Sequence, residues 1–262
     1  MVLDNKDAGV QNLDQTQDWR YYDWYKTNGL ILKEYFEVSN YISSVKKITR
    51  AAPQTILFYK SLNQSTAREE ELEQWSSRME DENFQDLYSS GFIKMWSAFE
   101  AGLENIIAKY IEHDRALAET LMVFTKVRLD MSLWPWRMDE RLRIAAKLER
   151  RSAEGPPEIH LRLARLFSYV DIVLGPCFDS RKPDADRAGD LGEANRIRNI
   201  ILHRYGIPDE TDISLFPNLE PWLNQNIPIS LEMFNRYYMA IIIFLRSVRD
   251  GIERRIKQRQ SD

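Results

Sequence analysis

The most constraining feature of the 262-residue sequence is a regular apolar repeat near its C-terminal end. Apolar residues recur there at alternating spacings of three and four: Leu231, Phe234, Tyr238, Ile241, Leu245, Val248 and Ile252. This spacing places one residue per turn on the same face of an α-helix. Residues 239–245 are apolar on every side, so we expect this helix to be buried against more than one neighbour. Ser230 is a candidate for its N-cap.

Similar periodicities predict helices through most of the chain. The expected helices cover residues 31–52, 92–110, 115–133, 137–151, 157–173 and 190–206. The last of these is expected to begin at a capping box formed by Asp190 and Glu193 and to end near Gly206. The Glu-rich residues 66–83 read as a solvated helix or a connector. The chain has only 10 Gly and 10 Pro, few for a turn-rich β fold, so we predict an all-α helical bundle.

Charge, cysteine and histidine content exclude several classes of site. The formal net charge of −4 excludes a uniformly basic nucleic-acid-binding coat but leaves room for local basic patches. The single cysteine, Cys177, excludes a disulfide framework, and the three histidines include no H-E-x-x-H pair for zinc. The longest apolar run has eight residues, far fewer than the roughly 20 of a membrane span, and the first residues lack a secretory signal. We expect a cytoplasmic protein without a metal, a cofactor or a membrane contact.

The candidate chemistry lies in residues 196–206, RIRNIILHRYG. On a straight helix Arg196, Asn199 and His203 share one face, and this polar patch can meet solvent, RNA or a second subunit. The opposite face is expected to pack inward through Ala194, Ile197, Ile201 and Tyr205. Arg198 lies at the edge of that apolar face, where a guanidinium needs a partner or an opening to a cleft. A straight helix does not bring Arg198 and His203 together.

The pattern R-N-x-x-x-H-x-Y over Arg198–Tyr205 resembles the R-x4-6-H motif of HEPN domains, and especially that of HEPN toxins paired with nucleotidyltransferase antitoxins. A helix of the type SxFEAxLENI, residues 97–106, precedes the motif as it does in that family. The resemblance covers roughly residues 85–258. It implies a helical bundle that acts as a metal-independent endoribonuclease, with one cleft built from the motifs of two subunits.

The same resemblance divides the chain into regions. Residues 1–17 read as a loose acidic tail, and residues 18–82 as a helical extension that a minimal HEPN bundle lacks. The HEPN-like bundle occupies residues 83–260, with an insertion at about residues 115–155. The implied setting is toxin–antitoxin or antiviral defence, with RNA as substrate, a homodimer as the active form and an antitoxin or regulatory protein as a further partner.

The resemblance assigns Arg198 and His203 as the catalytic pair and Asn199 as their helper. The residues assigned to substrate binding are Arg196, Arg204 and Tyr205. An imidazole, with a pKa near 6.5, can exchange protons with the ribose 2′-oxygen or the leaving 5′-oxygen, and a guanidinium matches phosphate oxygens. The implied products are a 2′,3′-cyclic phosphate and a 5′-hydroxyl. Tyr205 packs inward, stacks on a base, or carries the hydroxyl that an antitoxin modifies.

Other interpretations of these residues stay open. His203 can simply interact with the last carbonyls of its helix, and Arg196 and Arg204 can be solvated surface charges. The whole domain can be a non-catalytic module that binds RNA, a nucleotide or a protein partner. Two segments with a net charge of +4 each, residues 141–151 and 246–259, can hold RNA or form solvated helix faces. The turn over residues 134–136 can stack on bases or plug the bundle.

Overall fold

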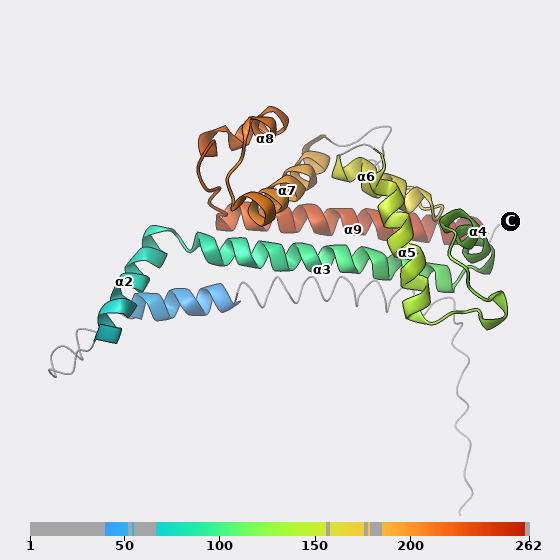
Figure 1. Cartoon of the computed structure of the whole chain (residues 1–262), viewed down its shortest axis with the longest axis horizontal. Coiled ribbons are helices and arrows are strands. Elements are labelled where there is room, and N and C mark those ends of the chain that lie inside the picture. The colour runs from blue at the N-terminus through green and yellow to red at the C-terminus, as the bar shows by residue number, and fades with distance from the viewer. Residues whose placement is uncertain are drawn as a thin grey trace, which may run out of the picture.

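Helices make up the regular structure of the protein in the part that is described (Figure 1). The computed structural model describes residues 40–51, 54, 67–155, 158–175, 178 and 185–259, and it contains no β-strand within them. The predicted all-α fold is therefore confirmed. The predicted acidic tail, residues 1–17, lies outside the described residues.

Two long helices form the axis of the bundle and lie side by side in Figure 1. They are α3, Gln85–Glu112, and α9, Leu231–Arg259. Their apolar stripes meet through aromatic pairs such as Phe92 with Tyr237 and Phe99 with Phe244, whose ring centroids are 5.3 and 5.7 Å apart. The expected stripe of α3 is buried: Phe92, Met95, Trp96, Phe99, Leu103, Ile106 and Tyr110. The C-terminal repeat is buried from Phe234 onward apart from the half-buried Tyr238, whereas Leu231 is exposed because it lies in the first turn.

The start of α9 is capped as the sequence predicts. The Ser230 hydroxyl accepts a hydrogen bond from the backbone N–H of Met233 at 3.1 Å, and the Ser230 carbonyl accepts one from Phe234 at 3.0 Å. This satisfies a backbone donor that the first turn of a helix leaves free. The position of α9 is thereby fixed against the preceding chain.

The predicted helix over residues 115–133 is shorter than expected. Helix α4, Arg115–Thr125, ends where Lys126 takes a left-handed conformation with φ 57°, and a separate 3-10 turn, η1, covers Met131–Leu133. Helix α5, Met138–Ala153, then crosses α3. Between them, Trp136 is 3% exposed and its indole N–H donates to the Asp130 carbonyl at 2.8 Å. Trp136 therefore packs in the hydrophobic core of the bundle, and its side chain is not accessible for stacking on a base.

Two expectations in the second half of the chain are wrong. Helix α6, Ile159–Ser168, ends before Val173, which lies outside any helix and is exposed. Helix α7, Ala185–Arg204, begins five residues before Asp190, so Asp190 and Glu193 are internal positions and not a capping box. The carboxylate of Glu193 is buried, and it accepts a hydrogen bond from the Tyr237 hydroxyl on α9.

The remaining helices complete the two ends of the molecule. The chain between α7 and α9 forms α8, Glu210–Leu215, and the 3-10 helix η2, Pro217–Trp222. At the other end, α2, Ala67–Asp81, packs on a helix over residues 40–51 through the hydrogen bond from Ser76 to the Thr49 carbonyl. Within the described part of the chain, no helix combines the length and the apolar character that a bilayer crossing requires.

Candidate functional site

The motif occupies the C-terminal half of α7 and the turn that follows it. Helix α7 ends at Arg204, Tyr205 and Gly206 have positive φ values of 55° and 84°, and the Gly206 N–H donates to the Ile200 carbonyl at 3.1 Å. This backbone arrangement terminates the helix in the way that a glycine favours. Tyr205 consequently leaves the inward face and is 91% exposed. The interpretation of Tyr205 as a core residue is therefore wrong.

Arg198 points from α7 towards α3. Its guanidinium donates to Glu100 Oε2 at 3.2 Å and to the side-chain oxygen of the adjacent Asn199 at 2.9 Å. The side chain of Arg198 is 26% exposed and that of Glu100 is 47% exposed. The expectation that Arg198 needs a partner or an opening to a cleft is confirmed, because it pairs with Glu100 and both residues line a cavity.

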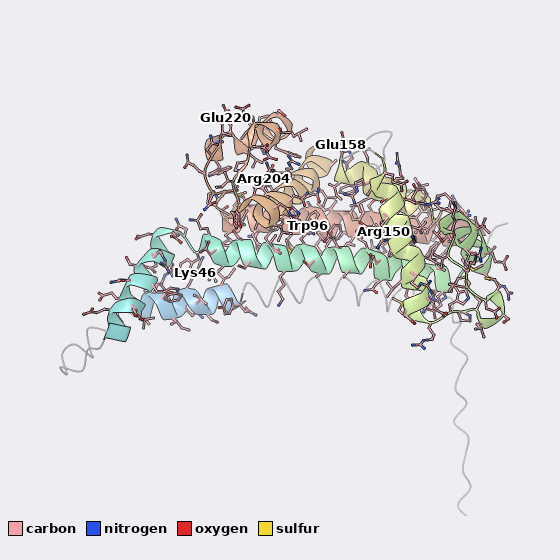
Figure 2. All side chains as sticks on the ribbon, in the orientation of Figure 1. Lys46, Trp96, Arg150, Glu158, Arg204 and Glu220 are labelled. Carbon is pink, nitrogen blue, oxygen red and sulfur yellow. The ribbon has the colours of Figure 1, made fainter. Side chains whose placement is uncertain are left out.

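This cavity, which we call the α3–α7 cavity, has a volume of about 500 Å³. Helices α3, α5, α6 and α7 contribute its walls. Its polar lining comprises Glu100, Glu104, Glu149, Ser152, Arg162, Asn195, Arg198 and Asn199. Its apolar lining includes Phe99, Leu103 and Leu166, as well as Trp96, which Figure 2 labels on α3. A cavity of this size with a few convergent polar groups is typical of a ligand site.

The charges of the α3–α7 cavity are largely paired, with one carboxylate left over. Arg198 pairs with Glu100, and Arg162 donates to Glu149 at 3.4 Å. Burial raises the pKa of Glu104, the negative charges of Glu149 and Glu100 raise it further, and Arg150 acts in the opposite direction. The surroundings of Glu104 therefore disfavour additional negative charge, and a phosphate is better placed beside Arg198.

His203 lies elsewhere on the surface of the same protomer. It is exposed in the last turn of α7 and does not line the α3–α7 cavity. Five helical residues separate it from Arg198, which corresponds to a rise of about 7.5 Å and a rotation of about 140°. Around His203, the apolar side chains of Leu202, Tyr205 and Ile207 are also exposed. Within one protomer the structure does not bring Arg198 and His203 into one cavity.

Arg196 and Arg204, the other basic residues of the motif, bind a buried carboxylate. Arg196 and Arg204 both donate to Asp212 of α8, whose side chain is fully buried, and Arg204 also pairs with Asp209. Figure 2 shows Arg204 near the end of α7 that faces α8. Burial opposes ionisation of Asp212, but hydrogen bonds from Arg204, from the backbone N–H of Asp209 and from Arg196 outweigh it and lower its pKa. These contacts join α7 to α8.

A second cavity of about 440 Å³ adjoins the first one, since Arg162, Asn195 and Asn199 line both. It also contains His160 and Arg196, and burial lowers the pKa of His160. The sequence around His160 contains no motif that would indicate a role for it. Asn199 therefore borders both cavities. The spacing of apolar residues in the sequence does not indicate this position.

The structure also adds residues that the sequence did not single out. Glu100 supplies a carboxylate from the helix that faces the motif and pairs with Arg198 across 98 positions of sequence, and Glu104 lines the same cavity. The only sequence signal was their four-residue spacing in the segment that resembles the helix preceding the family motif. Arg162 and Glu149 gave no signal.

The two predicted basic segments are partly used within the protein itself. In residues 141–151, Arg141 is buried against Glu112, and Arg151 lies over the ring of Phe124 at 4.2 Å. In residues 246–259, Arg255 pairs with Asp171, and other members pair with acidic residues or a carbonyl. Among the described residues, no three Asp, Glu, His or Cys side chains are grouped closely enough to hold a metal ion.

Comparisons with known proteins add no relative. No protein-family model matches the sequence, no curated protein is significantly similar to it, and no solved structure matches its fold significantly.

Proposed function

We propose that the protein is a metal-independent endoribonuclease whose active form is a homodimer. The observation that supports this most is the placement of the motif arginine. Arg198 lies partly exposed at the mouth of a polar cavity, oriented by Asn199 and by a carboxylate that is itself half exposed. A fork of donors held in this way is suited to the negative charge that develops on a phosphate during cleavage.

The reaction needs no group beyond those of the chain and the RNA. The ribose 2′-oxygen loses its proton to a base and attacks the adjacent phosphorus, and the bond from phosphorus to the 5′-oxygen breaks. The 5′-oxygen takes up a proton, which leaves a 2′,3′-cyclic phosphate and a 5′-hydroxyl. His203 is assigned to proton transfer because its imidazole is exposed and an imidazole can both accept and donate a proton. Arg198 stabilises the charged phosphorane.

In the proposed dimer, a second subunit brings a histidine close to the arginine of the first. Arg198 and His203 do not share a cavity within one protomer, so the composite site places the arginine of one protomer near the histidine of its partner. The exposed apolar residues Leu202, Tyr205 and Ile207 surround His203 and provide surface for such a contact. In a twofold dimer the same patch meets itself, which generates two equivalent sites.

The test is cleavage of a mixed RNA pool in EDTA by the wild type, Arg198→Ala and His203→Ala. Loss of the general acid–base group is expected to slow cleavage by about 10²–10⁴-fold, and loss of the arginine by about 10²–10³-fold. His113→Ala is the matched control, because His113 is also an exposed imidazole at a helix C-terminus and is expected to change the rate less than about twofold. No cleavage by the wild type, or equal cleavage by His203→Ala, contradicts the proposal.

Mixing the two inactive variants tests the shared site directly. A heterodimer of Arg198→Ala with His203→Ala retains one intact combination if the two residues come from different protomers. Random pairing makes half of the dimers heterodimers, so about a quarter of the wild-type activity should return. If both residues act from the same protomer, the mixture stays as inactive as its components.

A second candidate function is a non-catalytic helical module that binds RNA or another partner. Its support is that Arg198 is paired with Glu100 and that His203 is remote from the cavity in one protomer. In this case RNA binds without being cut, and Arg198→Ala weakens binding without affecting any cleavage rate. The RNA cleavage assay in EDTA separates the two candidates, because only the first one predicts a 2′,3′-cyclic phosphate product.

A further inference from the structure

A basic groove lies on the outer side of α5, and the proposed site does not include it. The groove has a volume of about 440 Å³ and is lined by Lys126, Val127, Arg128, Arg143, Ala146, Lys147 and Arg150. Five of these seven residues are basic, and no acidic side chain lines the groove. All five basic side chains are exposed, unlike Arg141, which is buried in an ion pair.

Local structure explains why these charges converge. Arg143, Lys147 and Arg150 follow one another at spacings of four and three on α5, so they project from the same helix face. The segment directly after α4 supplies the other two charges, Lys126 and Arg128, because Lys126 ends the helix in a left-handed conformation. Val127, which is 8% exposed, anchors this turn in the core between Lys126 and Arg128. The groove is therefore formed by the backbone fold and not by flexible side chains alone.

The groove and the α3–α7 cavity use different faces of α5. Arg150 lines the groove, and the next residue towards the N-terminus, Glu149, lines the cavity. The charge of Arg150 also acts on Glu104 inside the cavity. Figure 2 labels Arg150 on α5, the helix that supplies both walls. Successive residues of a helix project about 100° apart, so the two linings face different directions, and only the charge of Arg150 reaches the cavity.

We infer that this basic groove binds the phosphate backbone of single-stranded RNA, an inference that rests on the proposed function for the identity of its polyanion. Exposed Lys and Arg side chains bind phosphates and release counterions, which gives affinity without base recognition. The bases of such a strand point away from the groove wall, because its lining contains no aromatic residue for stacking. The groove also gives a role to the segment over residues 115–155, which a minimal HEPN bundle lacks.

The test uses a fluorescein-labelled 20-nucleotide RNA and fluorescence anisotropy in the His203→Ala background, so that binding is measured apart from cleavage. Arg143→Gln with Lys147→Gln removes two charges from the groove. The matched control, Arg246→Gln with Lys257→Gln, removes two exposed charges from α9. For single-stranded RNA each lost phosphate contact lowers the slope of log affinity against log salt by about 0.7, so the groove variant should lose about 1.4 of slope and on the order of tenfold in affinity.

Each outcome decides the inference. A reduced slope and affinity in the groove variant, with the control near the parent protein, supports it. Equal losses in both variants overturn it, because net charge and not the groove then governs binding. Binding to vesicles that contain phosphatidylserine, with RNA affinity unaffected by the groove substitutions, also overturns it in favour of a membrane surface. Since the assay does not depend on cleavage, failure of the groove and failure of the nuclease are distinguishable.

Discussion

Replacing Asp212 by Asn is expected to lower the free energy of unfolding by about 2–4 kcal/mol. Asp212 is fully buried and accepts hydrogen bonds from the Arg196 and Arg204 guanidinium groups and, at 2.7 Å, from the backbone N–H of Asp209. A hydrogen bond to a charged group contributes about 1.5–3 kcal/mol. Three of them set an upper bound that must be reduced, because the two guanidinium groups are about 30% exposed and regain water contacts.

The asparagine introduces a second cost besides the lost charge. One carboxylate oxygen becomes an NH₂ group that faces N–H donors, and a buried donor without an acceptor is unfavourable. For a chain of this size, 1 kcal/mol corresponds to roughly 2–4 °C, so the melting temperature should fall by about 4–16 °C. Thermal unfolding followed by circular dichroism at 222 nm measures this shift. Glu210→Gln is the matched control, because it removes an exposed negative charge from the same helix and should shift the melting temperature by less than 2 °C or so.

The pH dependence of this difference has a fixed sign. The pKa of Asp212 is lowered in the folded protein, while its unfolded value is about 3.9. Its contribution is therefore fully present above the unfolded pKa and is lost as the pH falls through the lower folded pKa. The wild type and Asp212→Asn should differ by a constant amount between about pH 5 and pH 7 and converge below about pH 4. A difference under 0.5 kcal/mol or so at pH 7, or one that persists unchanged at low pH, refutes the reasoning.

The other predictions concern packing, protonation and the proposed site. Gly189→Ala should raise the free energy of unfolding by up to about 1 kcal/mol, because the added methyl group meets nothing within 4 Å. Gly251→Ala should lower the free energy of unfolding by about 1–3 kcal/mol, because its methyl group meets the Val173 carbonyl at 2.7 Å. Urea titration measures both changes. Burial lowers the pKa of His160, so the stability that neutral His160 provides is present above about pH 6.5 and is lost as the pH falls through the folded value. His160→Gln should remove this part of the pH dependence of the melting temperature. Glu100→Gln should lower the KM for RNA cleavage severalfold, because the phosphate no longer competes with a carboxylate for the arginine; an unchanged or higher KM contradicts this.

The parts of the fold that could be predicted are those where one helix face is continuously apolar. The C-terminal repeat and the stripe of α3 specify their own burial, because any other orientation exposes many large side chains. Val173 and Tyr205 were misplaced for a common reason. Each continues a helical spacing past the residue at which the helix ends, and the ends depend on left-handed turns at Asp171 and Tyr205 that periodicity does not detect. Lys126 ended the predicted helix over residues 115–133 in the same way.

Pairs of polar residues were harder to place. The D-x-x-E pattern of Asp190 and Glu193 fits a capping box, but the same spacing also puts both carboxylates on one face of a helix interior, where they bind Arg236 of α9. Likewise, the edge position of Arg198 predicted that a partner exists but not that this partner is Glu100, since the choice depends on how α3 packs against α7. Burial of Asp212 could not be predicted either, because it depends on the fold of α8 against α7.

The environments of Arg196 and Arg198 decide between them as phosphate ligands. Arg196 binds a fully buried carboxylate that also holds Arg204, so releasing it leaves a buried charge and breaks the junction of α7 with α8. Arg198 binds Glu100, which is 47% exposed and can return to water when it is displaced. A partly exposed ion pair contributes about 0–1 kcal/mol, which a phosphate contact readily exceeds. The motif resemblance and the energetics therefore favour the same arginine, whereas the solvated-charge interpretation of Arg196 is replaced by a structural role.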